Sequence, residues 1–235
     1  KSADQIVQYI EEQGYTTEWI LETHMHADHL SAARYLKERL GGKSAIGEHV
    51  KDVQELYKDA FNTDADYDSE LSNFDELWKD DDTFMIGNIP ATVWYTPGHT
   101  PADIVYIIGD SLYAGDTMFM PDFGSARCDF PGGSASSLFD GRDRIFTLPD
   151  EMRMFMCHDY LPEGRDEYQW ETTIGEQKRN NIHLHEGVAK ADFVAMRETR
   201  DKTLEIPKLM IPSIQVNIRA GALPPPENDG KQYLK

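Results

Sequence analysis

Four side chains of the kinds that bind metals fall within six residues near the start of the chain: His24, His26, Asp28 and His29. In an extended or turning backbone, His24 and His26 can point one way while Asp28 and His29 turn to another side. Imidazole nitrogen suits zinc and iron, and a neighbouring carboxylate can bridge or neutralise the ion. This density of ligands predicts a metal-binding turn rather than a group of structural histidines.

Helical and strand patterns surround this turn and continue along the chain. Ile6, Val7 and Ile10 recur at helical spacing before Gly14, whereas short apolar runs bounded by Gly and Pro are typical of strands. Together they predict sheets covered by helices. We expect helices over 2–13, 31–40, 48–60, 171–180 and 191–202, and strands over 18–22, 43–47, 83–86, 91–95, 104–108 and 112–114.

Composition restricts the partners of the chain. Its 235 residues contain 23 basic and 42 acidic side chains, a net charge of −19, which disfavours nucleic acid and anionic membranes as partners. We find no run apolar enough to cross a bilayer and no leader sequence at the start, and Cys128 and Cys157 are too few for a disulfide framework. These features predict a soluble, cytoplasmic protein.

Two stretches depart from the general pattern. Residues 61–82 are heavily acidic and include a D-x-D-x-D spacing, but they lack the Gly and the final Glu of a calcium loop. We therefore expect a solvated insertion there, covering part of a site or an oligomer contact. Residues 203–235 are predicted to form an irregular, Pro-rich C-terminal extension.

Three further ligand candidates follow predicted strands. His99 lies directly after a strand in Thr-Pro-Gly-His-Thr, Asp116 follows the next strand in Ala-Gly-Asp-Thr, and His158 follows an apolar run. A glycine beside His99 and one beside Asp116 let the backbone bend so that each side chain aims across the edge of the sheet. With the ligand turn, these residues indicate one metal-binding edge.

This series of residues resembles the ligand series of the metallo-β-lactamase superfamily. The resemblance implies an α/β fold, the αββα four-layer sandwich, as a single domain over residues 1–235, with its first strands preceding residue 1. It also implies two adjoining metal sites that share Asp116. Site one would use His24, His26, His99 and Asp116, and site two Asp28, His29, His158 and Asp116.

Within the superfamily the chain resembles the persulfide (sulfur) dioxygenases of the ethylmalonic encephalopathy protein family, bacterial branch. That likeness implies one Fe(II) per chain held by His24, His99 and Asp116, with glutathione persulfide and O₂ as substrates and sulfite and glutathione as products. It rests on residues 23–29, 96–100, 126–130, 157–160 and 216–221. By the same likeness, Arg127 and Arg219 would hold the glutathionyl carboxylates, with Asp129 and Tyr160 as lesser candidates, and His26, Asp28, His29 and His158 would orient ligands or hold a second metal.

Other functions remain open at this point. A glyoxalase II-like hydrolase of glutathione thioesters, with two zinc ions or a mixed zinc and iron pair, would use the same seven ligand types, although we see no separate helical substrate domain after His158. A non-catalytic metal-binding protein would be expected to lack ligands, and none is missing. A thiol nucleophile at Cys157 is disfavoured because Cys157 and His158 alternate in direction along a strand. The assembly, including a homodimer, is also left open.

Overall fold

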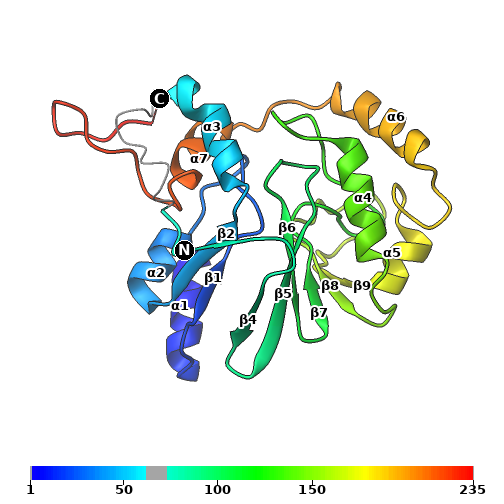
Figure 1. Cartoon of the computed structure of the whole chain (residues 1–235), viewed down its shortest axis with the longest axis horizontal. Helices are drawn as coiled ribbons and strands as arrows, with labels where there is room; N and C mark the ends of the chain where they lie inside the picture. The colour runs from blue at the N-terminus through cyan, green and yellow to red at the C-terminus, as the bar shows by residue number, and fades with distance from the viewer. Residues whose placement is uncertain (1, 62–72, 235) are drawn as a thin grey trace. The chain divides into compact units, whose positions relative to one another are not determined.

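A computed structural model of the chain describes residues 2–61 and 73–234 (Figure 1). The chain divides into two compact units, one comprising residues 1–78 and 205–235 and the other residues 79–204. Each unit contains one β-sheet together with helices of its own. The single domain expected over residues 1–235 stays a prediction.

The first unit is built on a parallel sheet with the strand order β1-β2-β3. Ile20 of β1 lies opposite Ser44, and Ile46 of β2 lies opposite Leu77. Because parallel neighbours cannot be joined by a tight hairpin, helices α2 and α3 connect successive strands. The elements are α1 (Ser2–Gln13), β1 (Trp19–Leu21), α2 (Ala33–Leu40), β2 (Lys43–Gly47), α3 (Val50–Phe61), β3 (Glu76–Trp78) and α7 (Met210–Asn217).

The acidic stretch 61–82 is not a solvated insertion where the structure describes it. Strand β3 lies within it, and the side chains of Phe74 and Trp78 are buried. Asp75 is tied to the sheet because its carboxylate accepts hydrogen bonds from the backbone N–H of Ser44 at 2.6 Å and from Lys37. The carboxylate of Asp75, which the acidic sequence suggests would face solvent, thus fixes the start of β3 against β2. Residues 62–72 lie outside the described residues.

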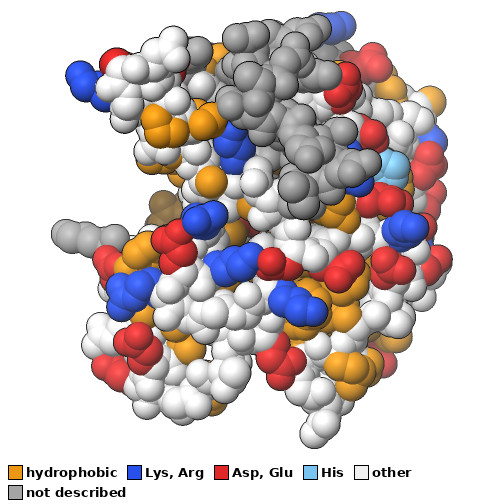
Figure 2. Space-filling view, turned by 60° about the vertical axis from the view of Figure 1, so that its left-hand side comes forward, with side chains coloured by type: hydrophobic (Ala, Val, Ile, Leu, Met, Phe, Trp, Pro, Cys, Tyr) orange, Lys and Arg blue, Asp and Glu red, His pale blue; other side chains and the backbone are white. Residues whose placement is uncertain are grey.

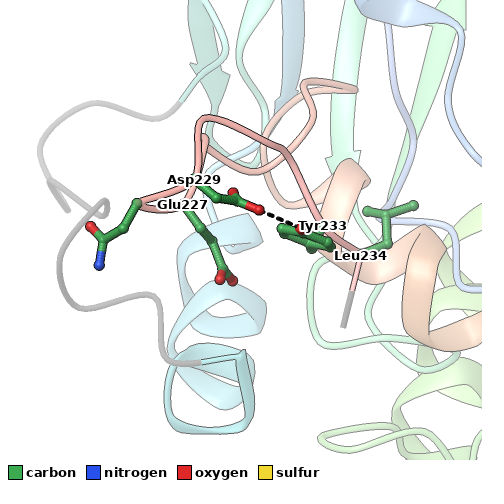
Figure 3. A pocket seen from close by; sticks show the side chains of 5 residues that line it. Glu227, Asp229, Tyr233 and Leu234 are labelled. Carbon is green, nitrogen blue, oxygen red and sulfur yellow. Dashed lines mark hydrogen bonds between the residues drawn. The ribbon is translucent and has the colours of Figure 1, made fainter.

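The C-terminal extension 203–235 is also more regular than expected, because it contains α7. After α7 the chain folds back on itself, and Tyr233 donates a hydrogen bond to Asp229 at 2.6 Å (Figure 3). A shallow hollow forms there, lined by Glu227, Asn228, Asp229, Tyr233 and Leu234. The polar groups that line this hollow are carboxylates, an amide and a phenol. None of its lining residues is a histidine, in contrast to the ligand turn.

The second unit is built on a six-stranded sheet of order β4-β5-β6-β7-β8-β9, antiparallel except where β7 pairs parallel with β8. Helices α4, α5 and α6 lie along one side of this sheet in Figure 1. Its core joins strand residues such as Leu112 and Met154 to helix residues such as Leu138 and Phe193. The elements are β4 (Thr83–Ile86), β5 (Ile89–Tyr95), β6 (Ile104–Ile108), β7 (Ser111–Tyr113), α4 (Ala135–Ile145), β8 (Arg153–Phe155), β9 (Glu171–Thr173), α5 (Ile174–Asn180) and α6 (Lys190–Asp201).

Two elements of this unit differ from the sequence-based expectation. The helix expected over 171–180 begins only at residue 174, because residues 171–173 pair with β8 as the edge strand β9. Helix α4 is not predicted from the sequence. Its N-terminal signal is present, because the side chain of Ser134 caps the helix by accepting a hydrogen bond from the backbone N–H of Ser137. The buried face of α4 includes Gly141 and Arg142, which mask its apolar periodicity.

Charged side chains of the second unit are largely engaged with one another. Across the middle of the face shown in Figure 2, Lys and Arg side chains lie among Asp and Glu side chains. Ion pairs include Arg144 with Asp80, Arg153 with Glu171, and Lys190 with Asp140. Within residues 2–61 and 73–234 we find no helix with the length and apolar character that a bilayer crossing needs.

Candidate metal centre

The ligand turn of the first unit follows β1 and gathers three imidazole rings. His24 and His26 are buried, and their ring centroids lie 4.1 Å apart, while the rings of His26 and His29 are separated by 4.3 Å. The ligand atoms of His26, Asp28 and His29 all lie within 4.8 Å of one another. Asp28 and His29 are about half exposed and pair at 3.1 Å, which raises the pKa of His29.

Asn217, at the C-terminal end of α7, holds this turn through its side chain. Its amide nitrogen donates to the backbone carbonyls of His26 and His29, each at 2.8 Å. Its amide oxygen accepts the backbone N–H of Ser31, also at 2.8 Å. Since Asn217 is buried, these hydrogen bonds are made away from water and fix the backbone of the turn. The sequence analysis includes Asn217 in a family-like segment but singles out only Arg219 there.

The second unit brings its three ligand candidates together at the ends of its strands. Oδ2 of Asp116 lies 3.6 Å from Nε2 of His99 and 3.7 Å from Nε2 of His158. Two ligand atoms bound to one metal at about 2.1 Å stand roughly 3.0–3.6 Å apart. The carboxylate therefore lies between two imidazole nitrogens at separations that suit shared metal coordination better than hydrogen bonding.

His99 is held in one orientation by its neighbours. Its Nδ1 lies 2.8 Å from the carbonyl oxygen of Arg127, and its ring meets Phe130 edge to face. A carbonyl can only accept, so Nδ1 carries the proton and Nε2 keeps the lone pair that a metal needs. Gly98 lets this loop approach α4, because a Cβ there would lie 2.4 Å from the Cβ of Leu138.

A buried carboxylate behind His99 organises the same loop. Asp103 is fully enclosed and accepts hydrogen bonds from the backbone N–H of Thr100 at 2.8 Å and from its hydroxyl at 2.5 Å. Burial raises the pKa of Asp103 to about 7, against the lowering effect of these hydrogen bonds. Asp103 is not among the candidate residues predicted from the sequence, although an Asp three residues after a loop Thr is a recognisable local hydrogen-bonding pattern.

The residues expected to bind substrate have different surroundings. Arg127 makes a two-pronged ion pair with Asp129, at 2.6 and 2.8 Å, which raises the pKa of Arg127 and lowers that of Asp129. Tyr160 is 52% exposed and stacks on Phe123. Arg219 is buried, and its guanidinium donates a hydrogen bond to the backbone carbonyl of Gln215 in α7. Tyr160 and Asp129 are thus the more exposed of the four, while the side chain of Arg127 is 15% exposed.

Asp159 anchors the loop that carries His158 by accepting hydrogen bonds from Arg165 and from the backbone N–H of Gln169. Because this anchor is a carboxylate, we expect the stability of the fold to depend on pH. Hydrogen bonds from Arg165 lower the pKa of Asp159 from 3.8 to about 2. The ionised Asp159 therefore stabilises the fold above pH of about 4, and this contribution is lost as the pH falls towards 2. We expect Asp159→Asn to lower the free energy of unfolding by about 2 kcal/mol at pH 7 and by about half as much at pH 3.

Urea unfolding of the metal-free protein at both pH values measures this difference. Asp140→Asn is a suitable control, because the ion pair of Asp140 with Lys190 is exposed and is expected to contribute less than about 1 kcal/mol. An equal loss of stability at pH 7 and pH 3 would show that the charge of Asp159 is not responsible.

Imidazole nitrogens and carboxylate oxygens are the donors of both units, and this set suits zinc, iron and similar ions. A family model described as the metallo-beta-lactamase superfamily matches residues 2–158. The chain belongs to the metallo-β-lactamase superfamily. The predicted metallo-β-lactamase fold, mixed α/β with sheets flanked by helices, is thereby confirmed, and the superfamily is one of metal-binding enzymes.

Relatives in the superfamily carry several names. A "Beta-lactamase hydrolase-like protein" of Xylella fastidiosa is 51% identical over all of this chain, and "Glyoxylase B2" of Dictyostelium discoideum is 49% identical. The chain covers 54% of the first protein and 81% of the second, so it spans about half the length of the Xylella relative. "Persulfide dioxygenase ETHE1, mitochondrial" of Bos taurus is 25% identical over 96% of this chain and 78% of its own length.

Among solved structures, ETHE1 from Myxococcus xanthus is similar, with 30% identity and a TM-score of 0.76 over 93% of this chain and 84% of that one. The resemblance to persulfide dioxygenases is therefore confirmed as a relationship within the superfamily. The relationship to persulfide dioxygenases is more distant than the relationship to the hydrolase-like and glyoxylase proteins. All of these relatives agree in placing the chain in the metallo-hydrolase superfamily.

Proposed function

We propose that the chain is an iron-dependent persulfide dioxygenase that converts glutathione persulfide and O₂ to sulfite and glutathione. In this proposal His24 of the first unit and His99 and Asp116 of the second hold one Fe(II). Iron held by two histidines and one carboxylate supplies open coordination positions at which a sulfur substrate and O₂ can be activated. His26, Asp28, His29 and His158 would orient these ligands and bound water.

The observation that carries the proposal is the orientation of His99 beside Asp116 in a chain whose fold resembles ETHE1. The carbonyl of Arg127 leaves Nε2 of His99 as the ligand atom, and Oδ2 of Asp116 lies 3.6 Å from it. Two of the three proposed ligands, one imidazole and one carboxylate, belong to a single unit, and their closeness supports the proposal.

The substrate would be recognised through its carboxylates and through contact with an aromatic ring. Arg127 already binds a carboxylate with a two-pronged geometry, that of Asp129, and a glutathionyl carboxylate can replace or join this partner. The exposed ring of Tyr160 offers an apolar surface close to His158, with ring centroids 5.8 Å apart. The buried Arg219 would act through the backbone of its own segment.

A second candidate function is a hydrolase of glutathione thioesters with two metal ions, zinc or zinc and iron. Two observations favour it: relatives about half identical to the chain are named as a hydrolase-like protein and a glyoxylase, and Asp116 lies between His99 and His158 at nearly equal distances. A carboxylate in that position suits bridging of two metals.

Oxygen uptake separates the two candidates. Iron-loaded protein is given glutathione persulfide, and O₂ consumption and sulfite are recorded; zinc-loaded and iron-loaded protein are given S-lactoylglutathione in parallel. We expect rapid O₂ uptake with one sulfite per O₂ and little thioester cleavage. Thioester cleavage without O₂ uptake by protein that contains iron would overturn the dioxygenase proposal and favour the hydrolase.

A further inference from the structure

Helix α6 of the second unit carries a buried ion pair, Arg197 with Asp201. The two residues are 2% and 4% exposed, and Nε of Arg197 donates to Oδ1 of Asp201 at 2.8 Å. Burying both charges costs several kcal/mol of hydration, so such a pair is tolerated only where further hydrogen bonds satisfy it. The pair makes those hydrogen bonds to one loop, residues 125–128, which includes the proposed substrate residue Arg127.

The contacts to this loop are specific. Nη1 of Arg197 donates to the backbone carbonyl of Ser125 at 3.2 Å. Oδ2 of Asp201 accepts the backbone N–H of Cys128 at 2.8 Å. The carbonyl of the same peptide group, which belongs to Arg127, accepts Nδ1–H of His99 at 2.8 Å. A single peptide group is therefore held at its N–H end by Asp201 and at its C=O end by His99.

We infer that Asp201 is a positioning residue for the metal ligand His99, acting through the peptide group that joins Arg127 to Cys128. The inference rests on the proposed function, in which His99 binds the metal. A negative charge on the N–H side of a peptide polarises it and strengthens the hydrogen bond that its carbonyl accepts. That stronger acceptor keeps the proton on Nδ1 of His99 and makes Nε2 a better ligand.

Close packing around this loop supports the same role. A Cβ at Gly133 would lie 2.4 Å from the carbonyl oxygen of Cys128, so the loop has little room to move in that direction. Asp201 binds the N–H of Cys128, and Gly133 packs against the carbonyl of Cys128, so the neighbouring carbonyl of Arg127 is held in a defined position beside His99. An Arg197–Asp201 pair that served stability alone would not need to bind the peptide group whose carbonyl accepts the hydrogen bond of His99.

The experiment measures metal binding rather than turnover. Co(II) is bound to the protein, its visible absorption spectrum reports the ligand geometry, and competition with a chelator gives its affinity. We compare wild type with Asp201→Ala, with Asp201→Asn, which keeps an acceptor for Cys128, and with His99→Ala. The matched control is Arg142→Met, because Arg142 is also buried and holds backbone carbonyls but makes its contacts at Leu184 and His185.

A fifth variant guards against failure to fold. Arg197→Met combined with Asp201→Leu replaces the whole pair by apolar side chains, which is often neutral or stabilising for a buried ion pair. This double variant keeps a packed core but removes the acceptor for the Cys128 N–H. Urea unfolding of each metal-free protein measures stability independently of metal binding.

We expect Asp201→Ala and the double variant to bind Co(II) roughly 10–100-fold more weakly than wild type with an altered spectrum, and Asp201→Asn to lose less than about tenfold. Arg142→Met should lose stability and keep its affinity. If Asp201→Ala and the double variant bind Co(II) like the control while His99→Ala does not, the positioning role is wrong and the ligand assignment stands. If His99→Ala also binds normally, the ligand assignment in the proposed function fails.

Discussion

Replacing His99 or Asp116 by alanine is expected to abolish both iron binding and turnover. Each substitution removes one of the three proposed ligands, and Asp116→Ala also removes the carboxylate that lies 3.7 Å from Nε2 of His158. The loss should exceed the roughly 10–100-fold that follows removal of a group which only supports a ligand. Iron content after gel filtration and O₂ uptake with glutathione persulfide measure the two effects.

The matched control for this expectation is His49→Ala. His49 is a partly exposed histidine of the first unit that pairs with Asp52, so the same chemical change is made outside the proposed centre. It should keep its iron and its activity. Full iron content with activity in either His99→Ala or Asp116→Ala would refute the assignment of these residues as ligands.

Replacing Asn217 by alanine is expected to loosen the ligand turn and to weaken metal binding by roughly 10–100-fold. The substitution leaves two backbone carbonyls and one N–H of the turn without the partner that fixes them, at a cost of about 1–3 kcal/mol for each group that stays buried. Asn217→Asp should act similarly on the two carbonyls, because a carboxylate cannot donate to them. Chelator competition and urea unfolding measure affinity and stability.

Gln54→Ala controls for the loss of a buried amide. Gln54 is 4% exposed, as is Asn217, and donates to the carbonyl of Ile218 at 2.9 Å in the same unit, but its hydrogen bond does not reach the turn. We expect a loss of stability with unchanged metal affinity. If both variants lower stability and neither changes affinity, Asn217 supports the fold and not the metal ligands.

The ligand candidates could be read from the chain because their signal is local. His24, His26, Asp28 and His29 stand within six residues, and His99 follows a strand that breaks at Pro97 and Gly98. Strands β4 and β6 agree with the expected ranges because their apolar runs are short and bounded by turns. Strand β3 could not be read in the same way, because Asp75 and its neighbours make the stretch polar while Ser44 and Lys37, far away in sequence, bind the carboxylate.

The sequence by itself determined the types of candidate metal ligand, their order along the chain and the superfamily they resemble, since these depend on side-chain chemistry and on spacing between near neighbours. Only the tertiary structure decided which groups hold those ligands in place. Asn217 reaches the turn across about 190 residues, and Asp201 reaches the peptide group behind His99 across 73 residues. The physical reason is that a buried polar group must find its hydrogen-bonding partner in space, and no periodicity along the chain records where that partner is.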